Sequence, residues 1–141
     1  MKRRPAIVDT NVVVAGVLTS DAEAPTARIL DGMIAGNVMF VLSLTLLAEY
    51  RRVLMRERIR ERHGLTGDEV DGVLTAIAAN AIVREPQPSE DKAPDPGDQH
   101  LWDLMAATSN AILVTGDNRL VERAPAGASV VSPATFLDGL S

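Results

Sequence analysis

The sequence predicts an α/β protein: a three-layer α/β/α sandwich on a mostly parallel sheet of about five strands. Two observations support this fold class. Short apolar runs alternate along the chain with segments of helical periodicity, the order that successive βαβ units produce. The runs are continuous rather than alternating, as in strands that are buried on both faces. The chain has 141 residues, so we expect residues 1–141 to form a single domain.

The individual elements follow from these patterns in chain order. Apolar runs predict strands at residues 5–9, 38–42, 111–115 and 129–132, with a weaker one at 81–84. Helical periodicity predicts helices at residues 26–35, 44–62, 67–80, 97–109 and 133–140. Local signals support several helix starts: Pro25, Thr66 with Glu69 at capping-box spacing, and Ser132 before Pro133. The proline-rich stretch 84–97 is expected to be a surface loop that leads into a site.

Composition excludes several functional classes. The chain has no cysteine, which removes disulfides and thiolate metal sites. Its only histidines, His63 and His100, lack the spacing of a histidine-rich zinc site. A net charge of −5 argues against a generally basic nucleic-acid binder but leaves room for a local basic patch. The sequence shows no signal peptide or membrane span, so we expect a soluble cytoplasmic protein.

Acidic residues lie where parallel strands end, and ligands of open parallel sheets bind at that edge. Asp9 ends the first strand, and Asp117 follows the strand at 111–115. Asp98 lies in the first turn of the helix at 97–109. Glu49 lies in the second turn of the helix that follows the second strand, at the border of its apolar face. We therefore expect four acids from four distant segments to converge.

Each acid also has a structural interpretation that needs no ligand. Short acidic side chains cap helices, occupy turns or interact favourably with the positive end of a helix dipole. One of these roles is available to each of Asp9, Asp95, Asp98 and Asp117. Glu49 alternatively pairs with Arg52 at i+3 on a solvated helix face. Asp103 is expected on the polar surface of its helix. The case for a site rests on several acids meeting at one sheet end.

Four clustered carboxylates cannot all stay ionised without compensation, because like charges raise one another's pKa. A hard divalent cation removes this conflict, and oxygen-only ligands suit Mg²⁺ or Mn²⁺. Such an ion beside a phosphodiester activates water and stabilises charge on the phosphate. Beyond Glu49, Arg52, Arg56 and Arg60 form a helical stripe that suggests an RNA phosphate track. The alternative is a solvated face balanced by neighbouring glutamates.

The chain also resembles a known family, through five motifs in order: "IVDTNV", "LLAEYRRVL", "DPGD", "ILVTGDNRL" and "VVSPATFL". Together they resemble the PIN-domain family, and most closely its toxin subgroup from prokaryotic toxin–antitoxin pairs. The resemblance implies a compact α/β/α fold, a Mg²⁺- or Mn²⁺-dependent endoribonuclease, a cognate antitoxin protein and a homodimer.

The same resemblance assigns roles residue by residue. The four acids of the family, which are both catalytic and metal-binding, match Asp9, Glu49, Asp98 and Asp117. Polar residues that support this pocket match Asn11 and Thr115, and Asp95 belongs to the "DPxD" pattern of the subgroup.

Two alternatives stay open at this point. A catalytically inactive PIN-like module would use the same fold to bind RNA or a partner protein. A phosphotransfer protein would use Asp9 as its nucleophile, although the phosphatase version requires a second aspartate where this chain has Asn11.

Overall fold

The computed structural model describes residues 4–139, so the last residue of the predicted helix at 133–140 lies outside the described part. Five strands are present in this range: β1 (Ala6–Val8), β2 (Val41–Leu42), β3 (Ile82–Val83), β4 (Ile112–Val114) and β5 (Ser129–Val131). The helices are α1 (Thr10–Leu18), α2 (Pro25–Ala35), α3 (Leu44–Leu54), α4 (Glu57–His63), α5 (Gly67–Asn80), α6 (Gln99–Ala106), α7 (Asn118–Glu122) and α8 (Pro133–Asp138), with a 3₁₀ turn, η1 (Pro96–Asp98).

All strand pairs are parallel. β4 lies between β1 and β5, with Ala6 opposite Ile112 and Val8 opposite Val114, and β2 pairs with β3. An isolated parallel bridge between Ala6 and Phe40 joins the two groups, which gives the strand order β3-β2-β1-β4-β5. Because the strands are parallel, their carboxyl ends lie at one edge. The predicted fold class is confirmed.

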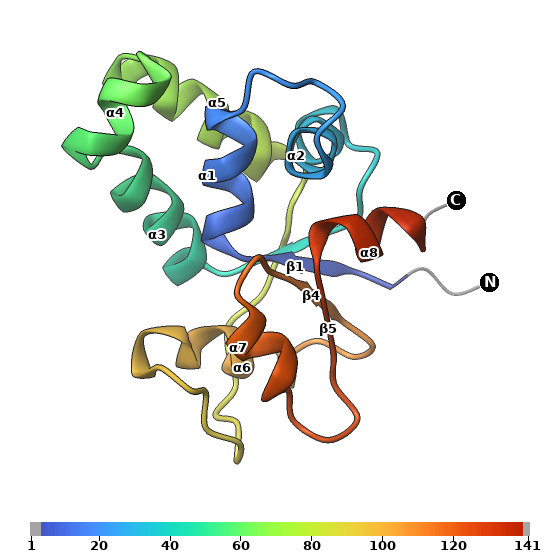
Figure 1. Ribbon diagram of the computed structural model, residues 1–141. Helices are drawn as coiled ribbons and strands as arrows, with labels where there is room; N and C mark the ends of the chain where they lie inside the picture. Colours follow the sequence, from blue (N-terminus) through green and yellow to red (C-terminus); the bar gives the residue numbers. More distant parts are fainter. Residues whose placement is uncertain (1–3, 140–141) are drawn as a thin grey trace.

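Helices cover both faces of this sheet (Figure 1). α1, α2, α5 and α8 lie on one side, while α6 and α7 lie on the other, and α3 stands beside α1 with α4 beyond it. This is the three-layer arrangement that the sequence predicts. Neither α1 nor α7 is predicted from sequence. The α1 segment contains the β-branched run Val12–Val14, which has low helix propensity, but that run is buried here against α2 and α3.

The predicted long helix at 44–62 is wrong, because it is two helices. α3 ends at Leu54, and Arg56 takes an extended conformation (ψ 137°) before α4 begins. His63 at the end of α4 folds back so that its Nε2 lies 2.9 Å from the Leu54 carbonyl oxygen, while its Nδ1 accepts the amide of Leu65 at 2.9 Å. The contact of His63, the last residue of α4, with Leu54 at the end of α3 therefore stabilises the break between the two helices.

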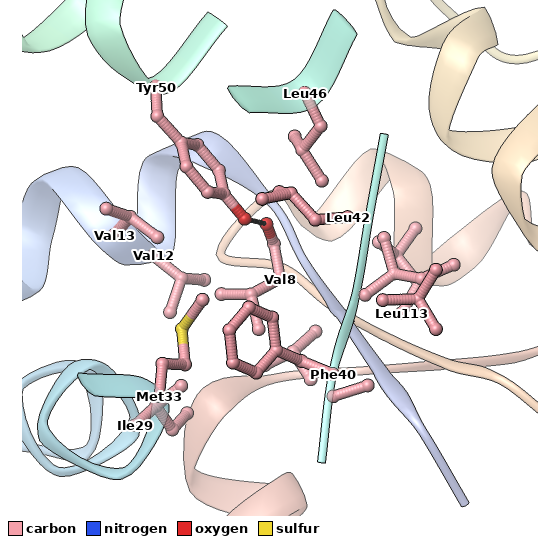
Figure 2. Packing of buried hydrophobic residues seen from close by; sticks show 14 of the residues in the cluster. Val8, Val12, Val13, Ile29, Met33, Phe40, Leu42, Leu46, Tyr50 and Leu113 are labelled. Atoms are coloured by element: carbon pink, nitrogen blue, oxygen red, sulfur yellow. Dashed lines mark hydrogen bonds between the residues drawn. The ribbon is translucent and has the colours of Figure 1, made fainter. Parts of the chain in front are cut away.

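Tyr50 connects the core to the strand edge. Its ring is fully buried among the residues shown in Figure 2, and its hydroxyl donates to the Val8 carbonyl. A buried carbonyl needs such a partner, so this bond fixes α3 against the end of β1. Tyr50 follows Glu49 directly, and Val8 precedes Asp9. The same contact therefore brings two of the predicted acids to one edge of the sheet.

Candidate functional site

A cavity of about 690 Å³ opens at the carboxyl ends of the strands. Its walls come from α1, α3, α4, the turn η1 and the loop between β4 and α7, elements that are widely separated in the sequence (Figure 1). The lining includes the four predicted acids, Asp9, Glu49, Asp98 and Asp117. Asn11, Arg52 and Arg56 also line it, whereas Thr115 lies beneath Asp9 and Asp95 lies outside the lining.

Asp9 is the most buried of these acids, with 4% of its surface exposed. Its Oδ2 accepts the hydroxyl of Thr115 at 2.8 Å and the amide of Asn11 at 3.2 Å. Asn11 also accepts the amide of Gly116 at 3.0 Å, which ties the end of β1 to the loop after β4. Burial raises the pKa of Asp9 to about 6, with further contributions from the charges of Asp98 and Glu49 that the Thr115 hydrogen bond opposes.

Glu49 is held by three partners. Thr10 donates its hydroxyl to Oε1, His100 Nε2 lies 3.3 Å from Oε2, and an Arg52 nitrogen lies 3.5 Å from Oε2. The i+3 pair with Arg52 is thus present, but the Glu49 side chain is only 16% exposed while that of Arg52 is 64% exposed. Thr10 and His100 were not predicted at this site, since no sequence spacing connects them to Glu49.

Asp98 faces the cavity without a donor. Within residues 4–139 nothing donates a hydrogen bond to its carboxylate, and it is half-buried. Burial raises the pKa of Asp98, and the charges of Asp95, Glu49 and Asp117 add to this effect. Asp95 accepts the amide of Gly97 at 2.8 Å, so its predicted role as a helix cap is confirmed.

Asp103 fastens the loop that carries these residues. Its Oδ1 accepts the amide of Ser89 at 3.0 Å and the side-chain amide of Gln99 at 3.1 Å. Gln99 in turn accepts the amide of Ala93 at 2.9 Å. The predicted surface position of Asp103 is wrong, because the loop folds back over this face of α6 and leaves Asp103 half-buried.

Asp117 differs from the other acids. It caps α7 by accepting the Arg119 amide at 2.9 Å, so its interpretation as a turn and cap residue is confirmed. The Arg119 side chain also forms an ion pair with the Asp117 carboxylate, in which Nη2 lies 3.1 Å from Oδ2 and Nε lies 3.3 Å from Oδ1. These bonds lower the pKa of Asp117. The pKa is thus raised for Asp9 and Asp98, mainly by burial with a smaller contribution from neighbouring charges, and lowered for Asp117.

The arginines that line the cavity are Arg52, Arg56 and Arg62. The predicted stripe of Arg52, Arg56 and Arg60 is therefore wrong at its last member. The break after Met55 changes the phase of the helix, so that Arg62 rather than Arg60 faces the cavity.

The donor chemistry suits a hard cation, because the four acids offer only oxygen and two of them have a raised pKa that a nearby positive charge would relieve. Three of the four carboxylates, those of Asp9, Glu49 and Asp117, nevertheless have protein partners. Within residues 4–139, no three histidine or acidic side chains are disposed together as metal ligands. Glu49 points to Thr10 and Asp117 to Arg119, which explains why the carboxylates line one cavity without forming a ligand cluster.

Comparison with known proteins identifies a family. The family model described as the PIN domain matches residues 5–119, from just before β1 into the first turn of α7. A search of curated proteins finds no match to this chain. None of the helices described in residues 4–139 is long and apolar enough to cross a membrane.

Proposed function

The chain belongs to the PIN-domain family, and on that premise we propose that it is an endoribonuclease that uses Mg²⁺ or Mn²⁺ to hydrolyse RNA phosphodiester bonds. PIN domains are generally nucleases, and they typically bind divalent metals. The observation that carries the proposal is that Asp9, Glu49, Asp98 and Asp117 come from four distant segments and line one cavity. Helix capping alone would not bring them together.

The roles of the residues follow from their contacts. Asp9, Glu49, Asp98 and Asp117 would hold the ion. A bound divalent cation supplies Lewis-acid activation of water and offsets the charge that develops on the phosphate. In addition, the Thr115 hydroxyl fixes the rotamer of Asp9. Thr10 and His100 do the same for Glu49 by binding its two oxygens.

Water is the proposed nucleophile, because the chain has no cysteine and no pair of histidines lines the cavity within residues 4–139. The oxygen of water bonds to phosphorus, the bond from phosphorus to the 3′ oxygen breaks, and that oxygen takes up a proton. The products are a 5′-phosphate and a 3′-hydroxyl. Labelled RNA fragments that end in a 2′,3′-cyclic phosphate would contradict this mechanism.

The decisive test is cleavage of structured and single-stranded RNA with Mn²⁺, Mg²⁺ or a chelator. We expect cleavage with either ion and none with the chelator. Asp98→Asn removes a charge without removing a hydrogen bond, and should lower activity by at least the roughly 10- to 100-fold that changes around metal ligands cost. It should also reduce the rise in melting temperature that Mn²⁺ gives. Asp91→Asn, an exposed change in the same loop, is the matched control.

The partners of Glu49 and Asp117 favour a second candidate, a non-catalytic module of the same fold that binds RNA or a protein. Arg52 and His100 lie within 3.5 Å of the Glu49 carboxylate, and Arg119 is paired with Asp117. In this case RNA would bind, but no metal would support cleavage. The cleavage assay separates the two candidates.

The biological setting is part of the proposal. We expect a cytoplasmic toxin that a cognate antitoxin protein neutralises, and a homodimer in solution. Supporting observations would be growth arrest on expression, relief by the product of an adjacent small gene, and a dimer mass in sedimentation equilibrium.

A further inference from the structure

We propose that Arg56 and Arg62, here called the basic end of the cavity, bind backbone phosphates of single-stranded RNA beside the bond that is cleaved. This inference rests on the proposed function, since it extends the same cavity. Both arginines line it together with the four acids, and both are exposed.

The cavity has two chemically distinct ends. Its lining follows α1 from Thr10 to Leu18, a path of roughly 14 Å at the rise of an α-helix. The acids lie at the strand edge where α1 begins. The helix α4, which contains Arg62 and begins directly after Arg56, packs against α1 and lies toward its far end (Figure 1). A polyanion that presents one phosphate to the acids would extend its neighbouring phosphates toward the arginines.

The basic end is free to accept a ligand. Within residues 4–139, neither Arg56 nor Arg62 forms an ion pair, although Glu57 and Glu61 follow and precede them directly in the sequence. Arg51 and Arg119, in contrast, are both paired with aspartates. Both side chains are exposed, so the guanidinium groups that a solvated face presents to water are also available to a phosphate.

Contacts at the end of α4 fix the position of Arg62 beside the cavity. The contact of His63 with the Leu54 carbonyl and the left-handed Gly64 (φ 68°) end α4 and hold it at an angle to α3. Ile59 packs against the core from the same helix, which orients the two arginines on either side of it toward the cavity. A straight helix would have placed Arg60 there instead.

The surface between the two ends suits a flexible single strand. Leu18, Val53 and Ile59 line it, and no aromatic side chain does so among the described residues. Riboses and base edges can pack on this apolar floor while guanidinium groups bind phosphates. A duplex holds its phosphates on a rigid helix, so it cannot follow a concave wall of this size. We thus expect single-stranded RNA to bind more tightly than a duplex of the same sequence.

The test is fluorescence anisotropy with a labelled single-stranded RNA in EDTA, which measures binding without cleavage. Each phosphate contact contributes about 0.7 to the salt slope for single strands, or about fivefold in affinity at 0.1 M salt. Arg56→Gln/Arg62→Gln should therefore weaken binding by about 25-fold and reduce the slope by about 1.4. Arg58→Gln/Arg60→Gln makes the same charge change on the same helix but outside the cavity lining, and should weaken binding by no more than about twofold.

Equal weakening in the two double variants would overturn the proposal, since net charge alone would then explain binding. So would wild-type affinity in Arg56→Gln/Arg62→Gln, which would assign the basic end to another ligand such as an acidic peptide. No measurable binding by the wild type at low salt, or equal binding of single strand and duplex, would also overturn it. RNA cleavage with metal, measured separately, would still support the proposed hydrolase in each case. A clear difference between the double variants without any cleavage would support the phosphate site and contradict the hydrolase.

Discussion

Asp9→Asn should stabilise the metal-free protein, and the gain should depend on pH. The pKa of Asp9 is about 6 in the folded protein, against an ordinary value of 3.8 that we take for the unfolded chain. Between these values the native state holds more protons than the unfolded state, so wild-type stability falls as pH rises through this window. Asparagine has the shape of the protonated side chain and avoids this loss.

The magnitude follows from the shift. About two pKa units at roughly 1.4 kcal/mol each give about 3 kcal/mol of destabilisation at pH 8. Asp9 is almost fully buried, so solvent screening does not reduce this figure greatly. The asparagine adds a buried amide donor, which costs about 1 kcal/mol if it stays unpaired. The expected net gain at pH 8 is therefore roughly 1–3 kcal/mol, and most of it should disappear at pH 4.

The assay is urea unfolding of wild type and variant in EDTA at both pH values. The difference between the two proteins cancels the titration of the groups that do not interact with Asp9, whereas Asp98 and Glu49, which do, keep a smaller contribution. Asp117→Asn is a control of opposite sign, because Arg119 lowers the pKa of Asp117, so removing its charge should destabilise the protein at pH 8 more than at low pH. A gain for Asp9→Asn that is equal at pH 4 and pH 8 would refute the reasoning.

Three further predictions follow from the contacts of the site. Arg119→Gln should raise Mn²⁺ affinity by at most about fivefold, because the exposed ion pair that it removes, Arg119 with Asp117, is worth up to about 1 kcal/mol. Calorimetry measures this affinity, and an unchanged value would mean that Arg119 does not compete with the ion. Tyr50→Phe should cost roughly 1–2 kcal/mol in urea unfolding and lower RNA cleavage, since it removes the bond that holds α3 to β1; an unchanged midpoint would contradict this. Asp103→Ala should speed amide exchange at Ser89 in the loop before η1, and equal exchange in both proteins would show that the loop holds without it.

Local signals predicted the elements that depend on neighbouring residues. The helix α5 has the predicted bounds, and it begins at Gly67 because Thr66 and Glu69 form both bonds of the capping box. The strands β1, β2, β4 and β5 were located well because buried parallel strands must be apolar, whereas the two residues of β3 are exposed and gave only a weaker signal. The break between α3 and α4 was not predicted, since the contact that holds it joins His63 to Leu54, nine residues away, across a stretch that has good helix propensity throughout.

In the candidate site too, features that depend on neighbouring residues were predicted and features that depend on distant contacts were not. Asp9 and Asp117 were predicted to lie at the carboxyl edge of the sheet because they follow strands, and Asp98 and Glu49 because they lie in the first two turns of helices, which needs no side-chain detail. Their partners were found only where they are near in sequence, as for Arg52 and Glu49. Thr10 and His100 reach Glu49 from 39 and 51 residues away, so only the packed fold reveals them.

The distribution of positive charge among the aspartates supports the proposed cation site. Asp71 on the surface is paired with Arg51 at 2.8 Å, and Asp117 at the cavity rim is paired with Arg119. Asp9 is far more buried than either, so a cation there would stabilise the fold most. Within residues 4–139, however, its partners are an uncharged hydroxyl and an uncharged amide, which orient the carboxylate but leave its charge uncompensated. Selection for stability alone would favour an arginine beside Asp9 that pairs with its carboxylate. A site that must accept a cation has to leave the charge of Asp9 unpaired.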